Sequence, residues 1–250
     1  DEHRSINAMS ARMAEFGVSV VFSSLEPDTA RRVYKSPLLI RTSFFSCLPG
    51  YVAKNFFYFS PPPIADRPLH IVYRGRTLPA FLGRLAQEKA LIGEQMKRVA
   101  EQHGLEVDIS SEEEVRIYGE AWPRFLMSGR ATLGVEGGAS IFDFDGSITQ
   151  SVERYRSEFP EAEFEQIWHA LLQQHEGNVV HRTLTPKLFE AIAAKTALIL
   201  YPGRYRDILE PGRHYIELAR DGSNTHEVVR MLHDSRLLQS LVNRAHEEVL

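Results

Sequence analysis

The sequence lacks several features that mark whole classes of protein. Cysteine occurs once in 250 residues, as Cys47, so no disulfide can form within the chain, as is usual for proteins of a reducing compartment. No stretch approaches the ~20 consecutive apolar residues of a membrane-spanning helix, and no signal peptide is recognisable at the start. The formal net charge is only −4, which does not favour nucleic acid as a partner. We therefore expect a cytoplasmic protein that does not bind nucleic acid.

What the sequence does contain is an alternation of strand and helix patterns. Apolar residues make up 43% and charged residues 25%, which is typical of a soluble globular protein. Beyond residue 68, β-branched and apolar runs alternate with amphipathic stretches. The expected strands are 69–75, 105–110, 130–138, 197–203 and 214–218, and the expected helices are 82–104, 111–129, 185–196, 225–234 and 235–250. This alternation predicts an α/β fold with a Rossmann-like, doubly wound parallel sheet.

A run of three prolines divides the chain. The segment FSPPPIADRP, residues 59–68, cannot continue a helix or a central strand. We therefore expect a linker at 61–68, with a partial α/β segment before it at 1–60. The main domain is expected at 69–235 and a closing helix at 236–250. Because residues 151–175 are polar and helical in pattern, residues 141–180 are expected to be an insertion.

Small or charged residues follow three of the expected strands. These groups are Arg74-Gly75-Arg76, Glu136-Gly137-Gly138-Ala139-Ser140 and Pro202-Gly203-Arg204-Tyr205. Each group alone has a plain alternative, a turn or a solvated edge. Doubly wound sheets, however, bind ligands beyond the carboxyl ends of their strands, and all three groups fall at that end. Two guanidinium groups suit phosphate oxygens, and glycines allow backbone N–H groups to approach an anion.

The expected helix 185–196 carries Lys187 and Glu190 three residues apart, on one face. A carboxylate near a helix start is also favoured by the helix dipole, so a structural role is a fair alternative. The functional interpretation is that Lys187 binds a phosphate and Glu190 binds sugar hydroxyl groups.

The segment FDFDGS, residues 142–147, allows more than one interpretation. It matches the D-x-D-G-[ST] pattern of haloacid-dehalogenase-type phosphatases, in which Asp143 would attack phosphorus beside Mg²⁺. It also matches the metal-binding D-x-D of some nucleotide-sugar enzymes. The phosphatase pattern normally opens its domain, whereas here it follows a long α/β stretch. We therefore favour a local turn in which Asp143 and Asp145 form capping hydrogen bonds.

Residues 187–218, KLFEAIAAKTALILYPGRYRDILEPGRHYIEL, carry a family resemblance. They resemble the carboxyl-terminal, donor-binding domain of GT-B-fold glycosyltransferases, most of all the bacterial "glycosyl transferase group 1" proteins related to the CgeB type. The resemblance extends over residues 69 to about 235 and rests on several motifs in order. It implies that Glu190 holds the ribose of the donor. The family's Glu-x7-Glu spacing is broken here, because Arg182 stands eight residues before Glu190. The resemblance then implies Glu136 as the counterpart of the family's earlier glutamate, and Lys195 stands where the family has the glycine that closes the helix.

The resemblance implies an enzyme of bacterial polysaccharide biosynthesis that needs no metal or other cofactor. It would move a sugar from a nucleotide-diphosphate sugar to a surface-glycan or other envelope acceptor, and a lipid-linked acceptor would bring it to the inner membrane surface. The implied catalytic residues are Glu136 and Arg76. The implied donor-binding residues are Arg74, Gly75, Gly137, Gly138, Ser140, Lys187, Glu190 and Tyr205.

In such enzymes the acceptor binds the amino-terminal domain, most of which is missing from this sequence. We therefore expect the chain to be a fragment or an unusually reduced enzyme. Two alternatives stay open: a non-catalytic module that binds nucleotide sugars, and a Mg²⁺-dependent phosphatase that uses residues 142–147.

Overall fold

A computed structural model describes residues 5–49 and 51–250. The chain forms two compact units, each made of three separate stretches. The first unit contains residues up to Pro49 with Leu78–Gln87 and Gly137–Thr183, and the second contains Gly50–Thr77, Glu88–Glu136 and Leu184–Leu250.

The second unit is built on a five-stranded parallel sheet, in the order β4-β3-β5-β8-β9. Its strands are β3 (Leu69–Arg74), β4 (Val107–Ser110), β5 (Gly129–Gly134), β8 (Ala197–Leu200) and β9 (Ile216–Glu217). In the centre of the sheet, Ile71 pairs with both Val107 and Ala131, and Ala131 also pairs with Ala197. Numbered along the chain, the order is 2-1-3-4-5, a common order of doubly wound sheets. The predicted α/β class and parallel sheet are confirmed.

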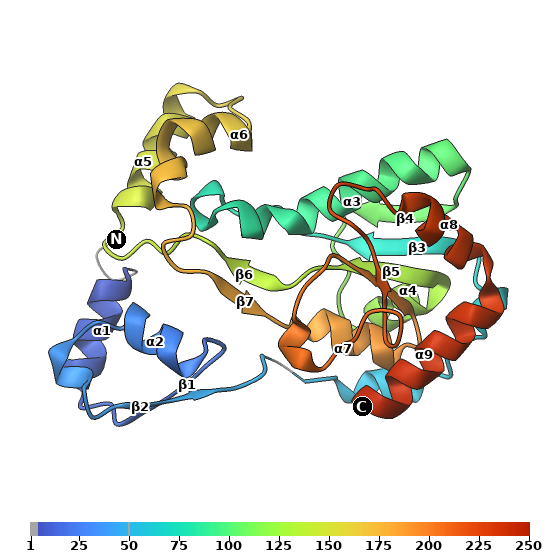
Figure 1. Ribbon diagram of the computed structural model, residues 1–250, viewed down its shortest axis with the longest axis horizontal. Coiled ribbons are helices and arrows are strands. Elements are labelled where there is room, and N and C mark those ends of the chain that lie inside the picture. The colour runs from blue at the N-terminus through green and yellow to red at the C-terminus, as the bar shows by residue number, and fades with distance from the viewer. Residues whose placement is uncertain (1–4, 50) are drawn as a thin grey trace. The chain divides into compact units, whose positions relative to one another are not determined.

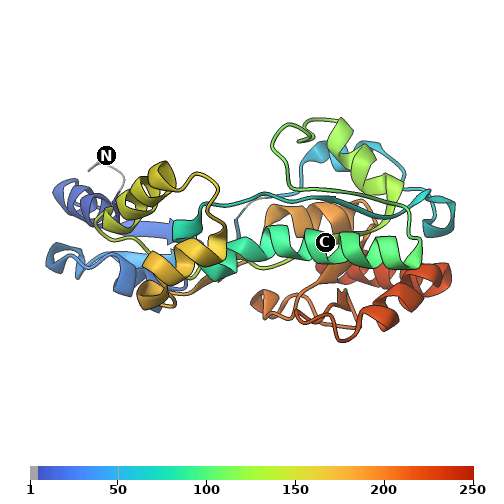
Figure 2. The same cartoon turned by 90° about the horizontal axis from the view of Figure 1, so that it is seen from above.

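Helices cover both faces of this sheet (Figures 1 and 2). They are α3 (Arg84–His103), α4 (Ala121–Ser128), α7 (Pro186–Ala193), α8 (Thr225–His233) and α9 (Ser235–Val249). Alternate residues of β8 face opposite sides, as the two-residue period of a strand requires. Ile199 belongs to the apolar cluster that contains residues of α3 and α8, whereas Leu198 packs in the cluster of α7. In Figure 2 the red helices α8 and α9 lie next to the green α3.

The connections that follow β3 and β5 lead to opposite faces of the sheet. Strand β3 is followed by α3, whose Ile92 and Met96 pack on one face. After β5, the next helix of this unit is α7, whose Leu188 and Ile192 pack on the other face. Because the two strands are hydrogen-bonded neighbours, the space beyond their carboxyl ends is left open between diverging connections.

The proline-rich segment is part of the second unit and does not form the expected linker. Ile64, in the short helix η4 (Ile64–Asp66), is fully buried, and Arg67 is only 1% exposed. The Arg67 guanidinium donates to the carbonyl oxygens of Pro62, Gly129 and Ala194 at 3.1, 2.8 and 3.1 Å. An apolar anchor and a buried cation therefore hold the segment against the sheet. The preceding helix η3 (Lys54–Tyr58), expected in the amino-terminal segment, also belongs to this unit.

Two expected elements are divided. Only residues 121–128 of the expected helix at 111–129 are helical, as α4, because Gly119 has a φ of 61° that a right-handed helix cannot accommodate. The expected strand at 130–138 splits into β5 and β6 (Gly137–Ala139), which pairs antiparallel with β7 (His181–Thr183).

The first unit has two smaller sheets. One is the parallel pair β1 (Val20–Ser23) and β2 (Ser43–Ser46), flanked by α1 (Ile6–Glu15) and α2 (Pro27–Val33). The other is the β6–β7 pair. Residues 141–180, expected as an insertion, supply α5 (Ser147–Glu158) and α6 (Phe164–Ile167) to this unit. Val179 packs with Leu25 and Phe44, so these residues share a core with the start of the chain.

The remaining short helices are η2 (Pro37–Leu39), η5 (Ala80–Leu82), η6 (Trp168–Leu172), η7 (Gln173–His175) and η8 (Tyr205–Asp207).

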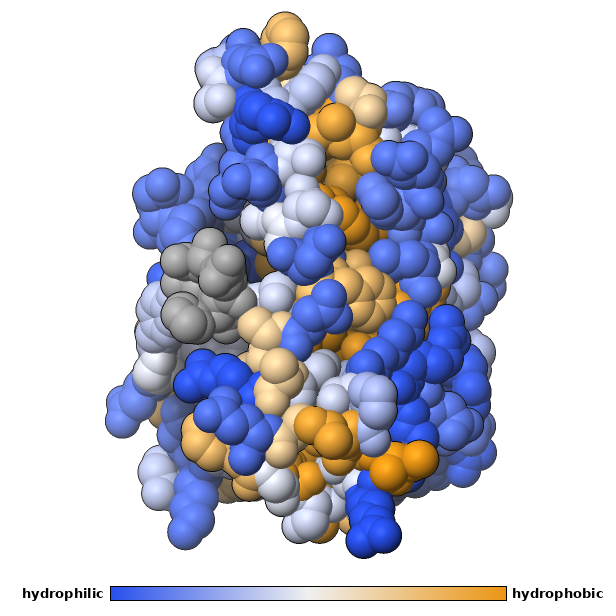
Figure 3. Space-filling view, turned by 90° about the vertical axis from the view of Figure 1, so that its left-hand side faces the viewer, coloured by the Kyte–Doolittle hydropathy of each residue, from blue (hydrophilic) through white to orange (hydrophobic). Residues whose placement is uncertain are grey.

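The first unit also exposes aromatic side chains. Phe22 of β1 and Phe45 of β2 stack with their ring centroids 5.6 Å apart, and they are 72% and 50% exposed. Figure 3, a view of the left-hand side of Figure 1, shows orange hydrophobic surface among the hydrophilic side chains.

Replacing Arg67 tests the anchor of the second unit. Arg67→Met keeps most of the side-chain volume but leaves several buried carbonyl oxygens without donors, which costs about 3 kcal/mol or more of unfolding free energy. Urea denaturation of this variant and of Arg236→Met, which changes an exposed arginine of α9, gives the comparison. Equal stability of the two variants would contradict the anchoring role.

Candidate functional site

A cavity of about 490 Å³ lies at the carboxyl ends of β3 and β5, within the second unit. Its size is within the usual range for small-molecule sites. The strands contribute Tyr73 to Arg76 and Leu133 to Val135, and the first turns of α7 contribute Thr185, Pro186, Lys187 and Glu190. The cavity thus occupies the switch point between β3 and β5, where the connecting chains diverge.

Lys187 lies between aromatic walls. Its Nζ atom donates to the carbonyl oxygen of Arg74 and lies 4.0 Å from the ring centroid of Tyr73 and 5.6 Å from that of Trp122. Trp122 in turn donates its indole N–H to Glu190 Oε2 at 2.8 Å. The helix α7 therefore presents an ammonium group and an oriented carboxylate to the same cavity, as their spacing of three predicted.

Positive charge exceeds negative charge in this cavity. Lys89, Arg76 and Arg116 also line it, whereas Glu190 is its single lining carboxylate among the described residues. Burial, followed by repulsion from Lys89 and Arg74, lowers the pKa of Lys187 to about 7, against the opposing attraction of Glu190. Burial and Arg76 also lower the pKa of Lys89. A bound anion would relieve this repulsion, so the cavity is suited to an anionic ligand.

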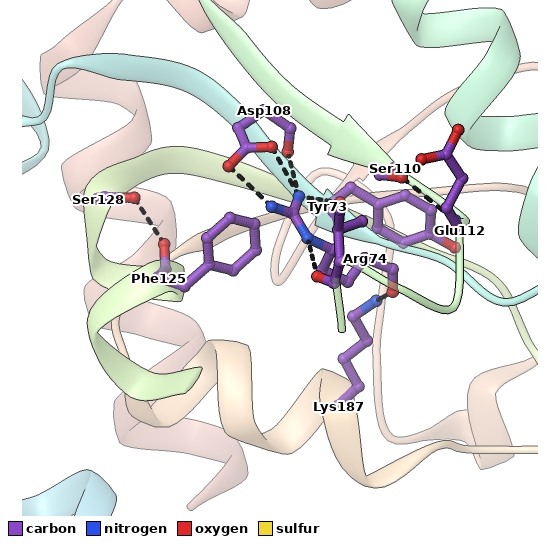
Figure 4. A network of polar contacts seen from close by, with 9 residues as sticks. Tyr73, Arg74, Asp108, Ser110, Glu112, Phe125, Ser128 and Lys187 are labelled. Carbon is purple, nitrogen blue, oxygen red and sulfur yellow. Dashed lines mark hydrogen bonds and ion pairs between the residues drawn. The ribbon is translucent and has the colours of Figure 1, made fainter. Parts of the chain in front are cut away.

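The guanidinium of Arg74 is held by Asp108 and is not free to bind phosphate, the role that the sequence predicted. Figure 4 shows its guanidinium facing the carboxylate of Asp108, with bonds of 2.7 and 2.9 Å. The group also lies 4.4 Å from the ring centroid of Phe125 and donates to the Val115 carbonyl at 3.0 Å. Because its donors are engaged, Arg74 fixes the end of β3 and offers the cavity its backbone. Arg76, by contrast, is exposed.

Gly75 is required by packing. A Cβ atom at this position would lie 2.2 Å from Ser111 Oγ and 3.0 Å from the Lys89 carbonyl oxygen. The same carbonyl accepts the Tyr73 hydroxyl at 2.7 Å, so α3 approaches the strand end closely. The sequence indicated a turn at this glycine, and the structure shows why a glycine is needed there: a larger side chain would collide with α3 and its neighbours.

Glu136 and Tyr205 lie outside the cavity and contact each other. Glu136 is 5% exposed, and its Oε1 accepts the Tyr205 backbone N–H at 2.9 Å. Tyr205 is 1% exposed and donates its hydroxyl to the Tyr201 carbonyl at 2.6 Å. Tyr205 is therefore a packed side chain in this structure, and it does not line the cavity as the implied role in donor binding would require. Glu136 holds the turn after β8.

Gly137, Gly138 and Ser140 belong to the first unit and do not line this cavity. Gly137 and Gly138 pair with Thr183 and Arg182 in the β6–β7 ladder instead of forming a loop around an anion. Gly138 has a φ of 134°, and a Cβ atom there would lie 1.8 Å from a backbone oxygen. Ser140 Oγ accepts the Leu85 N–H at 3.2 Å.

The segment 142–147 forms the local turn that we favoured. Asp143 accepts the N–H groups of Gly146 and Thr149 at 2.9 and 2.8 Å and the Thr149 hydroxyl at 2.7 Å, while Asp145 accepts the Ser147 N–H. These hydrogen bonds cap the start of α5.

Within residues 5–49 and 51–250, no cluster of three histidine, cysteine or acidic side chains could hold a metal ion. None of the helices described is long and apolar enough to cross a membrane.

Several lining residues were not predicted from the sequence. They are Asn55, Phe56, Tyr73, Lys89, Arg116, Tyr118 and Trp122. Most of them lie in segments whose pattern indicated only a helix or a boundary. Tyr73 and Lys89 could have been predicted from their positions, because Tyr73 lies at the end of β3 and Lys89 lies in the helix that follows that strand.

Comparison with known proteins finds a distant structural likeness but no family or curated match that informs the function of this chain. No protein-family model matches the sequence, and no curated protein matches it. A solved structure described as "Crystal Structure of TarM" is similar with a TM-score of 0.49 and 11% identity, over 97% of this chain and 42% of that chain. The present chain thus spans less than half the length of that solved chain. A likeness of this degree carries no argument about function.

The buried ammonium predicts a pH dependence of stability. In the unfolded chain Lys187 keeps its proton up to about pH 10.5, whereas in the folded chain its pKa is about 7. Between these values the unfolded state binds more protons, so folding stability rises with pH, by up to about 1.4 kcal/mol per unit. Urea unfolding from pH 7 to 9 should show wild type gaining stability relative to Lys187→Met. A stability difference between wild type and Lys187→Met that stays constant with pH would contradict the lowered pKa of Lys187. As a control, Lys97→Met, at an exposed position, should show no such pH dependence.

Proposed function

We propose that the second unit binds the nucleoside diphosphate of a sugar donor in this cavity, and that the chain acts as a glycosyltransferase. The observation that carries the proposal is the position of a positively charged, aromatic-walled cavity at the switch point between β3 and β5. Doubly wound sheets bind nucleotides at this place. The resemblance of residues 187–218 to the donor-binding domain of GT-B-fold glycosyltransferases supports the same function, and Lys187 and Glu190 of that segment line the cavity.

The charged side chains suit a diphosphate. Lys187, Lys89 and Arg76 would neutralise its oxygens, and the amino end of α7 adds the positive end of a helix dipole. When the bond between the sugar and the diphosphate breaks, negative charge grows on the leaving phosphate oxygen. Fixed cations stabilise that charge in the transition state. Lys187 would be protonated for this role, because a phosphate beside it favours the charged ammonium.

Glu190 is suited to hold the ribose. Its carboxylate is oriented by the Trp122 indole, which occupies Oε2 and leaves the group further capacity to accept hydroxyl groups. On this proposal the acceptor is a surface glycan or another envelope molecule, including a lipid-linked one, as the resemblance implies. A protein that binds the donor but transfers no sugar would be the non-catalytic alternative, and a transfer assay separates the two.

Calorimetry with UDP, GDP, CDP and dTDP, with and without Mg²⁺, tests the proposal. We expect saturable binding of at least one nucleotide without Mg²⁺. Lys187→Met should weaken it at least tenfold, since hydrogen bonds to charged groups contribute about 1.5–3 kcal/mol. Lys97→Met removes the same charge from an exposed position of α3 outside the cavity and should leave binding unchanged.

Two results would contradict the proposal. The first is equal nucleotide affinity in wild type and Lys187→Met. The second is Mg²⁺-dependent phosphate release that Asp143→Asn abolishes, without any nucleotide binding, which would assign the chemistry to residues 142–147.

A further inference from the structure

The cavity wall contains a buried acceptor that has no hydrogen-bond partner among the described residues. Asn55, in η3, lines the cavity, and its Oδ1 atom is buried without a hydrogen-bond partner among the described residues. Buried polar atoms in folded proteins nearly always have partners, and an acceptor left without one destabilises the fold. Such an atom in the wall of a ligand cavity indicates that its donor arrives with the ligand.

The position of Asn55 separates it from other buried atoms of this kind. Thr132 Oγ1 and Tyr215 Oη are also buried without a partner within the described structure, but neither residue lines the cavity. Thr132 lies within β5, and Tyr215 packs in the cluster of α7. Of these three residues, Asn55 is the one that borders the cavity.

The neighbours of Asn55 indicate the shape of the group it would meet. Phe56 and Trp122 line the same cavity and pack in one apolar cluster, which also includes Ala53. Aromatic walls of this kind favour a flat ring by stacking and exclude water from its edge. A ring that carries an N–H donor on that edge would satisfy the Asn55 oxygen.

We propose that Asn55 positions the nucleobase, with its Oδ1 accepting an N–H group of the base while Phe56 and Trp122 contact the ring. The inference rests on the proposed function, since it assigns the base of the nucleotide whose phosphates meet Lys187. Uracil, thymine, guanine and cytosine each carry an N–H donor on the pairing edge, so this contact orients the base. The choice among them is made by the rest of the cavity.

Asn55→Leu tests the assignment, because leucine has nearly the same size and no polar atom. Calorimetry with UDP, GDP, CDP and dTDP identifies the preferred nucleotide of the wild type. We expect Asn55→Leu to bind it about tenfold more weakly and to bind pyrophosphate and ribose 5-phosphate, which lack a base, as wild type does. The ligand-free variant should melt at the same temperature or higher, since an unsatisfied buried oxygen has been removed.

Four results would overturn the inference. Unchanged nucleotide affinity would mean that Oδ1 meets no ligand donor. An equal loss for ribose 5-phosphate would mean that it meets a sugar hydroxyl or that the cavity is damaged. A lower melting temperature together with weaker binding of all ligands would assign Asn55 a structural role. If wild type binds none of the four nucleotides, the proposed function fails, and the inference fails with it.

Discussion

The candidate site depends on one topological constraint, the parallel pairing of β3 with β5. The two strands are neighbours, yet the helices that follow them in this unit, α3 and α7, pack on opposite faces of the sheet. Because the two connections diverge, neither of them fills the space beyond the carboxyl ends of β3 and β5. Tyr73 and Gly75 from one strand end and Lys187 from α7 meet around that space, so residues far apart in the sequence form one cavity. The buried Arg67 ties the opposite end of the sheet to the proline-rich segment.

The cavity stores an electrostatic imbalance that a ligand can relieve. Lys187 lies against Tyr73 and near Lys89, where burial and like charge disfavour its ammonium form, and Glu190 offsets only part of this effect. Holding such groups together lowers the stability of the free protein, and residues that do so commonly serve binding or catalysis. Asn55 adds a second unfavourable feature of the free protein, since its buried oxygen lacks a protein partner among the residues described. Charge at one part of the wall and an acceptor at another both favour a ligand with an anionic end and a polar ring.

Local patterns in the sequence were enough to predict the sheet, the helices around it and part of the site. The end of β3 and the helix with Lys187 and Glu190 were found because glycine after a strand and a three-residue spacing have direct geometric consequences. Contacts between distant segments were not predictable in this way. Arg74 is taken up by Asp108, Tyr205 is buried against its own loop, and Gly137 and Gly138 enter a ladder with residues of the predicted insertion. Gly119, with its positive φ, likewise interrupts a helical pattern that charge and periodicity alone would continue, and the helix begins only after it.

The most direct test of this account is a crystal structure of the chain with the nucleoside diphosphate that it binds most tightly. The account predicts phosphate oxygens within hydrogen-bond distance of Lys187 Nζ, at the carboxyl ends of β3 and β5. A nucleotide bound elsewhere, for instance beside Asp143 at the start of α5, with the cavity around Lys187 empty, would contradict it.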